Sequence, residues 1–113
     1  MATYANLFVD QGADFATVVT LQDESTFDPL DITDLILYGQ VRRTYTSATA
    51  FDFIIAINDI EKAEIKVSLP SSTNENMKPG RYVYDIFADN STTGESFKVL
   101  QGILEIIPRV TRD

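Results

Sequence analysis

The sequence predicts an all-β domain, a sandwich of about seven short antiparallel strands. Two observations predict it: apolar and polar residues alternate in short runs, and turn-forming residues separate these runs along most of the chain. A third observation is size, because 113 residues suffice for one hydrophobic core and are too few for two. We therefore expect residues 1–113 to form a single domain.

Seven runs have the alternation, or the β-branched and aromatic residues, that are typical of strands. They are Ala5–Asp10, Asp14–Gln22, Ile36–Arg43, Phe51–Asn58, Ala63–Leu69, Arg81–Ala88 and Ser96–Ile107. The fifth run is the clearest, because its odd-numbered residues from 63 to 69 are apolar and its even-numbered residues are polar. One face of that strand should be buried and the other exposed.

The segments between the runs predict the connections. Asn58-Asp59 is typical of a hairpin turn, so the fourth and fifth strands should be antiparallel neighbours. Residues 23–35 are rich in turn formers and should carry the chain from one sheet to the other. Residues 70–76 place Ser and Thr at helix-capping positions ahead of Glu75, which predicts one helical turn there.

The segment Pro79-Gly80-Arg81-Tyr82-Val83-Tyr84-Asp85 indicates which kind of sandwich this is. A Tyr that begins a strand after a Gly-containing turn suits a tyrosine corner, in which its hydroxyl bonds to the preceding backbone. Tyr84 then occupies the position of the second cysteine of antibody domains. We therefore predict an immunoglobulin-like sandwich that lacks the antibody-type Cys and Trp residues.

The last predicted strand contains a candidate protein interface. If Leu100, Gly102, Leu104 and Ile106 face the core, Ile103 and Ile107 point outward as an exposed apolar pair. The alternative is that strand twist or the N-terminal strand covers them. Gly102 itself is interpreted as a bulge or a site of close packing.

Arg42, Arg43 and Tyr45 form a second candidate contact patch, because Arg and Tyr are enriched at interface hot spots. The alternative is an ordinary exposed strand end. The edges of the first and last strands are further docking candidates, since a free edge can add a strand from another chain.

Charge and composition exclude several classes of function. Nine Lys and Arg against seventeen Asp and Glu give a formal charge of -8, which opposes binding to nucleic acid and to anionic membrane surfaces. No apolar run reaches the roughly 18 residues of a membrane-spanning helix, and the first residues lack the pattern of a secretory signal. The absence of cysteine excludes disulfides and thiolate metal sites.

The sequence also predicts that the protein is not an enzyme and holds no cofactor. It contains no His and no Cys, the residues most often used as general base and thiol nucleophile. Asp23, Glu24, Asp28, Asp31 and Asp34 crowd one segment, which leaves calcium binding or, less plausibly, glycosidic chemistry open. Their spacing matches no EF-hand, and a solvated acidic loop is the favoured interpretation, so no metal site is predicted.

Tyr82 and Tyr84 are compatible with stacking on a sugar, but both lie on one face of a central strand beside Ile86. Packing in the core is the favoured interpretation.

Four segments carry a resemblance to a known group of proteins. They are the opening Ala2-Thr3-Tyr4-Ala5-Asn6-Leu7-Phe8-Val9-Asp10-Gln11-Gly12, the strand Gly39-Gln40-Val41-Arg42-Arg43, the segment from Pro79 to Asp85, and the ending from Gly102 to Arg112. Together they resemble small virion proteins of tailed phages, above all T4-like phages of marine cyanobacteria. The N-terminal domain of baseplate upper proteins from phages of Gram-positive hosts is similar in a looser way.

The resemblance implies a structural protein of the virus particle, made in the host cytoplasm. Its immunoglobulin-like fold would serve as an adaptor or decoration domain on head, neck, tail or baseplate proteins. Self-association in a symmetric ring or lattice is also open. The alternative function is a carbohydrate- or cell-surface-binding module of a phage adhesion apparatus.

Overall fold

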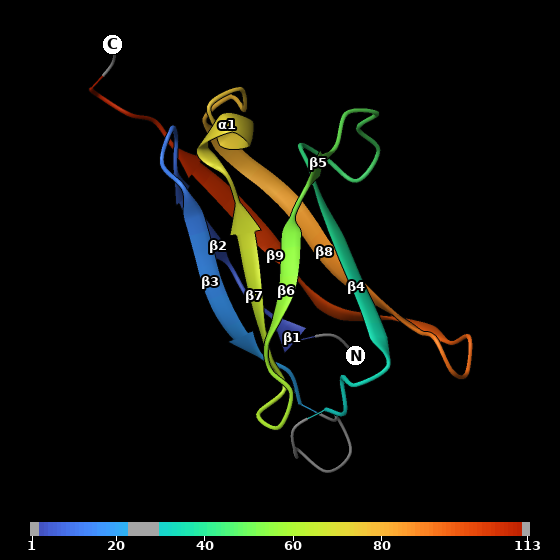
Figure 1. Cartoon of the computed structure of the whole chain (residues 1–113). Coiled ribbons are helices and arrows are strands. Elements are labelled where there is room, and N and C mark those ends of the chain that lie inside the picture. The colour runs from blue at the N-terminus through green and yellow to red at the C-terminus, as the bar shows by residue number, and fades with distance from the viewer. Residues whose placement is uncertain (1–2, 23–29, 112–113) are drawn as a thin grey trace.

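A computed structural model describes residues 3–22 and 30–111, which form two β-sheets packed face to face (Figure 1). The predicted all-β sandwich is confirmed. In chain order the elements are β1 (Thr3–Tyr4), β2 (Leu7–Asp10), β3 (Phe15–Thr20), β4 (Leu35–Arg42), β5 (Phe51–Asp52), β6 (Ile54–Asp59), β7 (Glu64–Leu69), α1 (Ser71–Asn74), β8 (Gly80–Asn90) and β9 (Ser96–Ile107).

The larger sheet has the strand order β1-β9-β8-β4-β5, and β2 lies on the same side of β9 as β1. The smaller sheet has the order β3-β7-β6. Because β3 and β4 belong to different sheets, the chain changes sheets between them, as predicted. Residues 23–29 of that connection lie outside the described ranges.

The N-terminal strands do not follow the predicted antiparallel pattern. Both β1 and β2 run parallel to β9, with Thr3 opposite Leu100 and Leu7 opposite Leu104. Parallel neighbours need a long connection, and these strands have one, since they stand at opposite ends of the described chain. The strand β1 is absent from the prediction because two residues are too few to show an alternation of apolar and polar side chains.

The single strand predicted over Phe51–Asn58 is wrong, because the chain changes sheets within it. Asp52 in β5 pairs with Gln40 of the larger sheet, whereas β6 pairs with β7 of the smaller sheet. At the break the Phe53 amide donates to the carbonyl oxygen of Gly39 at 3.1 Å, and its side chain enters the core with 7% of its surface exposed. The chain therefore passes from the larger sheet to the smaller sheet at a residue whose ring is buried between them.

The hairpin between β6 and β7 is confirmed, but its turn lies later than predicted. Asn58 and Asp59 belong to β6, and the turn follows at residues 60–63. The Asp59 carboxylate accepts a hydrogen bond from the Lys62 amide, and Ala63 closes the turn at φ 55°. The side chain of Asp59 therefore organises the turn from the strand that precedes it.

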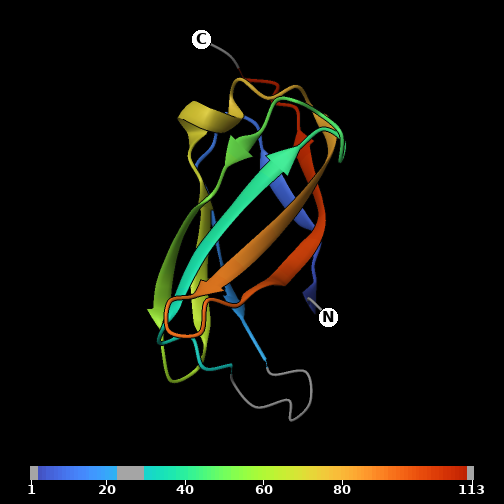
Figure 2. The same cartoon turned by 90° about the vertical axis from the view of Figure 1, so that its right-hand side faces the viewer.

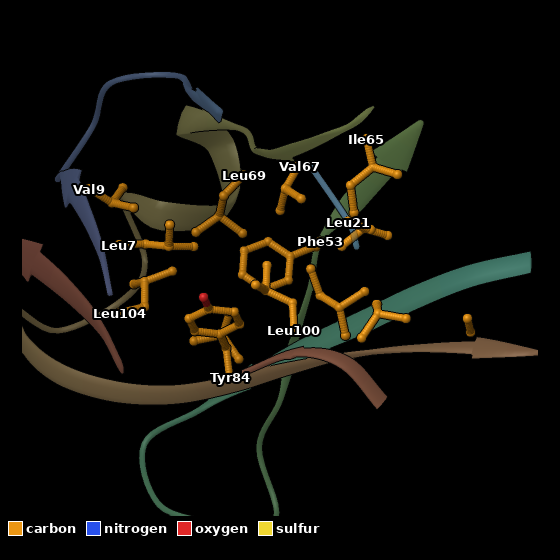
Figure 3. Close-up of a cluster of buried hydrophobic side chains, with 14 of the residues drawn as sticks. Leu7, Val9, Leu21, Phe53, Ile65, Val67, Leu69, Tyr84, Leu100 and Leu104 are labelled. Atoms are coloured by element: carbon orange, nitrogen blue, oxygen red, sulfur yellow. The ribbon is translucent and has the colours of Figure 1, made fainter. Parts of the chain in front are cut away.

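The core lies between the two sheets, and the predicted register of β9 is confirmed. Leu100, Leu104 and Ile106 are almost fully buried, and so is Gly102. In Figure 3, Leu100 and Leu104 face side chains of the smaller sheet, and Tyr84 and Phe53 belong to the same cluster. The rings of Phe53 and Tyr84 meet edge to face with 5.6 Å between their centroids, a favourable geometry for aromatic pairs.

The predicted tyrosine corner is also present. Tyr82 lies near the start of β8, and its hydroxyl donates to the carbonyl oxygen of Lys78 at 2.7 Å. Only 4% of the side chain is exposed, so the bond fixes the chain direction at the entry to β8.

The helical turn predicted for residues 70–76 is confirmed as α1, but its capping differs from the prediction. The N-cap residue is Pro70, and the carboxylate that accepts from the Ser71 amide belongs to Asp14, at 2.8 Å. These hydrogen bonds with Ser71 hold the pKa of Asp14 below its usual value. The buried Asn74 bonds to the Gly12 amide and the Ala13 carbonyl oxygen. Thus α1 is fastened to the turn between β2 and β3.

Gly102 is a position of close packing rather than a bulge. A Cβ placed on it would lie 1.9 Å from the carbonyl oxygen of Ala5 and 3.2 Å from the Tyr84 ring. The bulge in β9 falls instead beside the pairs Ile86–Leu100 and Phe87–Lys98. The missing side chain is what allows the N-terminal segment to lie against β9.

We expect Gly102→Ala to lower the free energy of unfolding by about 1–3 kcal/mol, the usual cost of forcing extra atoms into a packed site. Urea denaturation measures this. Gln101→Ala is the control, since Gln101 points to the outer face and its change should stay within about 0.5 kcal/mol. Equal stability of the two variants would contradict the close contact at Ala5.

The free energy of unfolding should also fall at alkaline pH because of the buried Tyr84. Burial, with a smaller contribution from Tyr4, raises its pKa to about 12 from the ordinary 10.0. The folded chain therefore keeps a proton that the unfolded chain loses, and the contribution is complete below pH 10 and disappears between pH 10 and 12. We expect the unfolding free energy of Tyr84→Phe to depend less on pH over that interval. Parallel pH profiles for the two proteins would contradict this assignment.

Candidate protein interface

The outward-facing side of the larger sheet brings together most of the residues proposed as contacts. Figure 2 shows β4, β8 and β9 side by side on this side of the molecule, with β2 beyond β9. Its outward side chains alternate with the buried ones in each strand. We call this surface the outer face and define it by Phe8, Ile36, Tyr38, Gln40, Arg42, Arg81, Val83, Asp85, Phe87, Lys98, Gln101, Ile103, Glu105 and Ile107.

Strand pairing places Ile103 and Arg42 in one row. Ile103 is opposite Val83, and Val83 is opposite Arg42. Ile107 lies at the end of β9, where 38% of its side chain is exposed, and Ile103 is half-buried. The N-terminal strands lie beside β9 rather than over it, so they leave this apolar pair on the outer face.

Two shallow hollows lie on either side of this row. One, of about 120 Å³, is lined by Arg42, Tyr45 and Val83 together with Gln40, Tyr84 and Asp85. The other, of about 110 Å³, is lined by Phe8, Ile103 and Arg81 together with Asn6, Leu7 and Glu105. The two patches predicted from the sequence, Ile103 with Ile107 and Arg42 with Tyr45, are therefore parts of one surface.

Arg43 does not belong to this surface. Its guanidinium lies over the ring of Tyr82, 4.8 Å from the centroid, at the end of the sandwich. Tyr82 points to the core side of β8, so Arg43, which follows the end of β4, lies on the side away from Arg42. Grouping the two arginines in one patch was therefore wrong.

Hydrogen bonds hold the polar side chains of the outer face in place. Arg42 donates to the carbonyl oxygen of Ser47 and to the Gln40 side chain, and Gln40 donates to the Asp52 carboxylate at 3.0 Å. Such a chain of bonds lowers the entropy lost when a partner contacts these groups.

Three exposed apolar residues of the outer face escaped the sequence prediction. Phe8 is 62% exposed, Ile36 61% and Tyr38 47%. In β4, Leu35 and Leu37 are apolar as well as Ile36 and Tyr38, so the apolar pattern alone does not say which side of this strand is exposed. Tyr38 stacks on Phe87 at 6.2 Å and donates to the Asp89 carboxylate, a bond that raises the pKa of the phenol.

Two further expectations from the sequence concern the tyrosines of β8 and the acidic segment. Tyr82 and Tyr84 are each 4% exposed, which confirms core packing and leaves neither ring for a sugar. Of the acidic segment, Asp31 and Asp34 are described, whereas Asp23, Glu24 and Asp28 lie outside the described residues. Within residues 3–22 and 30–111 no three acidic side chains gather as a metal site would require. None of the described helices is long and apolar enough to cross a membrane.

Comparisons with known proteins add a likeness of fold. No protein-family model and no curated protein matches the chain. Among solved structures, the chain is similar to part of InlP from Listeria monocytogenes, with a TM-score of 0.50 and 13% identity over 94% of this chain and 28% of that one. It is also similar to part of a family 123 glycoside hydrolase from Clostridium perfringens, with a TM-score of 0.45, 13% identity, and coverage of 97% and 24%. The chain thus spans about a quarter of the length of these proteins, and the first likeness concerns the fold alone.

Proposed function

We propose that this protein is a structural component of a tailed-phage virion, a small immunoglobulin-like adaptor or decoration domain that docks on a neighbouring head, neck, tail or baseplate protein. The virion assignment rests on the sequence resemblance, which extends over nearly the whole chain. The docking role rests on the outer face, where exposed apolar side chains share one surface with the row formed by Ile103, Val83 and Arg42.

The composition of the outer face supports protein contact. Phe8, Ile36 and Tyr38 expose apolar surface, and Arg42, Gln40 and Asp85 lie among them. Interfaces combine such apolar centres with polar groups that fix the register of the partner. The hollows beside Ile103 and Arg42 offer places where side chains of a partner can anchor.

Strand edges supply a second mode of contact, but not at the last strand as the sequence had predicted. β9 pairs with β8 on one side and with β1 and β2 on the other, so it has no free edge. In the part of the chain that is described, the edges of the larger sheet are β1 with β2 on one side and β5 beside β4 on the other, and the edges of the smaller sheet are β3 and β6. An extended segment of a neighbour would add at one of these edges.

The kinds of side chain that the protein has support binding over catalysis. With no His or Cys in the chain, its contact residues are aliphatic, aromatic and charged groups suited to protein recognition. The sugar-binding alternative loses its two candidate rings, since Tyr82 and Tyr84 are buried.

The virion assignment is tested by mass spectrometry of purified phage particles. We expect this chain at a fixed number of copies per particle, still attached after washing in high salt. Its absence from complete virions, with presence in infected-cell extracts, would overturn the proposal.

The docking face is tested by the double substitution Ile103→Ser and Ile107→Ser. We expect an intact fold, because both side chains point outward, and about a tenfold or larger loss of incorporation into particles. Circular dichroism and quantitative immunoblotting of particles measure the two effects.

Two variants serve as controls for that experiment. Val18→Ser changes a 49% exposed residue on the outward side of the smaller sheet and should leave incorporation unchanged. Leu104→Ser changes a fully buried residue and should unfold the domain. If the Ile103 and Ile107 variant unfolds as well, these residues belong to the core and the register of β9 is wrong. If it folds and incorporates normally, the outer face is not the docking surface.

A further inference from the structure

A larger hollow, of about 530 Å³, lies at the end of the sandwich where Figure 1 and Figure 2 place α1. It opens between the segment that follows β4 and the segment that joins α1 to β8. Its lining consists of Arg43, Ser47, Thr49, Phe51, Asn76, Met77, Lys78 and Tyr82. We call it the end groove.

The charge of the end groove is opposite to that of the protein. Arg43 and Lys78 are among its lining residues, and none of the eight is acidic, although the whole chain has a formal charge of -8. In the described part of the chain, a concave surface with two cations and no carboxylate favours an anionic group.

Contacts within the protein already hold the Arg43 guanidinium in one position. Its guanidinium lies on the Tyr82 ring, and one of its nitrogens is 3.4 Å from the carbonyl oxygen of Pro79. A Cβ on Gly80 would come within 2.9 Å of both terminal nitrogens, so glycine there leaves the space that the guanidinium occupies. Because the side chain is already ordered, less conformational entropy is lost when it binds a carboxylate.

The opposite wall is fixed by contacts with the rest of the fold. The tyrosine-corner bond from Tyr82 holds the backbone of Lys78, and Met77 beside it is 1% exposed. The Gln11 side chain donates to the Met77 carbonyl oxygen at 3.0 Å. The two cations therefore stand on walls that the core holds in position.

The floor of the end groove is apolar and its sides are polar. Met77 and Tyr82 are almost fully buried, so the half-buried Phe51 supplies the apolar surface on which a side chain of a ligand can lie. Ser47, Thr49 and Asn76 provide hydroxyl and amide groups able to pair with an extended backbone.

We propose that the end groove binds a short acidic segment of a partner polypeptide, in which an Asp or Glu carboxylate pairs with Arg43 and a neighbouring apolar side chain lies on Phe51. The inference rests on the proposed function in one respect, since it takes the ligand to be part of another protein. A nucleic acid does not fit, because two cations are too few to offset the repulsion between a polyanion and a protein of charge -8.

The test uses the ¹⁵N-labelled full chain and capped seven-residue peptides. The acidic probe is acetyl-Gly-Ser-Glu-Phe-Asp-Ser-Gly-amide, and the neutral probe has Gln and Asn in place of Glu and Asp. We expect the acidic probe to shift the backbone amides of Arg43, Ser47, Phe51, Met77 and Lys78, and the neutral probe to bind about tenfold more weakly. Equal binding of both probes, or no localised shift at millimolar peptide, would overturn the proposal.

Variants locate the effect. Arg43→Gln and Lys78→Gln should each weaken the acidic probe, and Arg43→Lys should restore part of the loss because it keeps the charge without the bidentate fork. Lys66→Gln is the matched control, since it removes an exposed cation on the outward side of the smaller sheet. A loss in Lys66→Gln equal to that in Arg43→Gln would show that only overall charge matters.

A second copy of the chain is the competing occupant. If the same amides shift when the protein alone is concentrated, and the acidic probe then fails to displace those shifts, the ligand is not a separate acidic segment. Because these measurements use the purified chain, the end groove can fail while the outer face still supports incorporation, and the reverse also holds.

Discussion

The position of the N-terminal segment depends on the absence of a side chain at Gly102. The carbonyl oxygen of Ala5 lies where a Cβ would stand, and the same oxygen accepts the hydroxyl of Tyr84. The Ala5 amide in turn donates to the carbonyl oxygen of Gln101 at 2.9 Å. One residue thus bonds to two strands of the larger sheet, and the hydroxyl of a buried tyrosine finds its partner outside its own strand.

This contact determines how the outer face is built. With the N-terminal segment seated against β9, β2 continues the larger sheet and places Phe8 beside Glu105 on the outer face. The hollow that contains Ile103 has walls from β2, β8 and β9, so it forms only when the segment is docked. A glycine buried in the sheet therefore acts on the surface proposed for docking, although it touches no partner.

The sequence predicts a strand best where one alternation of apolar residues runs through it. It predicts strands least well where two of them lie in a single alternating run of residues. In β7, and in β9 from Leu100 to Ile106, the alternation of apolar residues gives the correct buried side, because one face of the strand meets the core over these residues. Between residues 51 and 58 the same alternation continues while the chain changes sheets, since period alone does not say which neighbour supplies the hydrogen bonds. Arg42 and Arg43 show the same limit, because adjacent residues share a sequence patch yet face opposite sides.

The two proposed contact surfaces differ in the chemistry that they select. On the outer face Arg81, Arg42 and Lys98 stand near Glu105 and Asp85, so a partner is selected by shape and apolar fit more than by charge. In the end groove the cations have no acidic neighbour in the lining, and at physiological salt charges beyond about 8 Å are screened. A short acidic segment is therefore attracted by the two cations of the end groove more strongly than it is repelled by carboxylates elsewhere on the protein. An extended acidic surface would also approach the carboxylates outside the end groove and be repelled by them. The overall charge of -8 then restricts the size of an acidic ligand and does not forbid one.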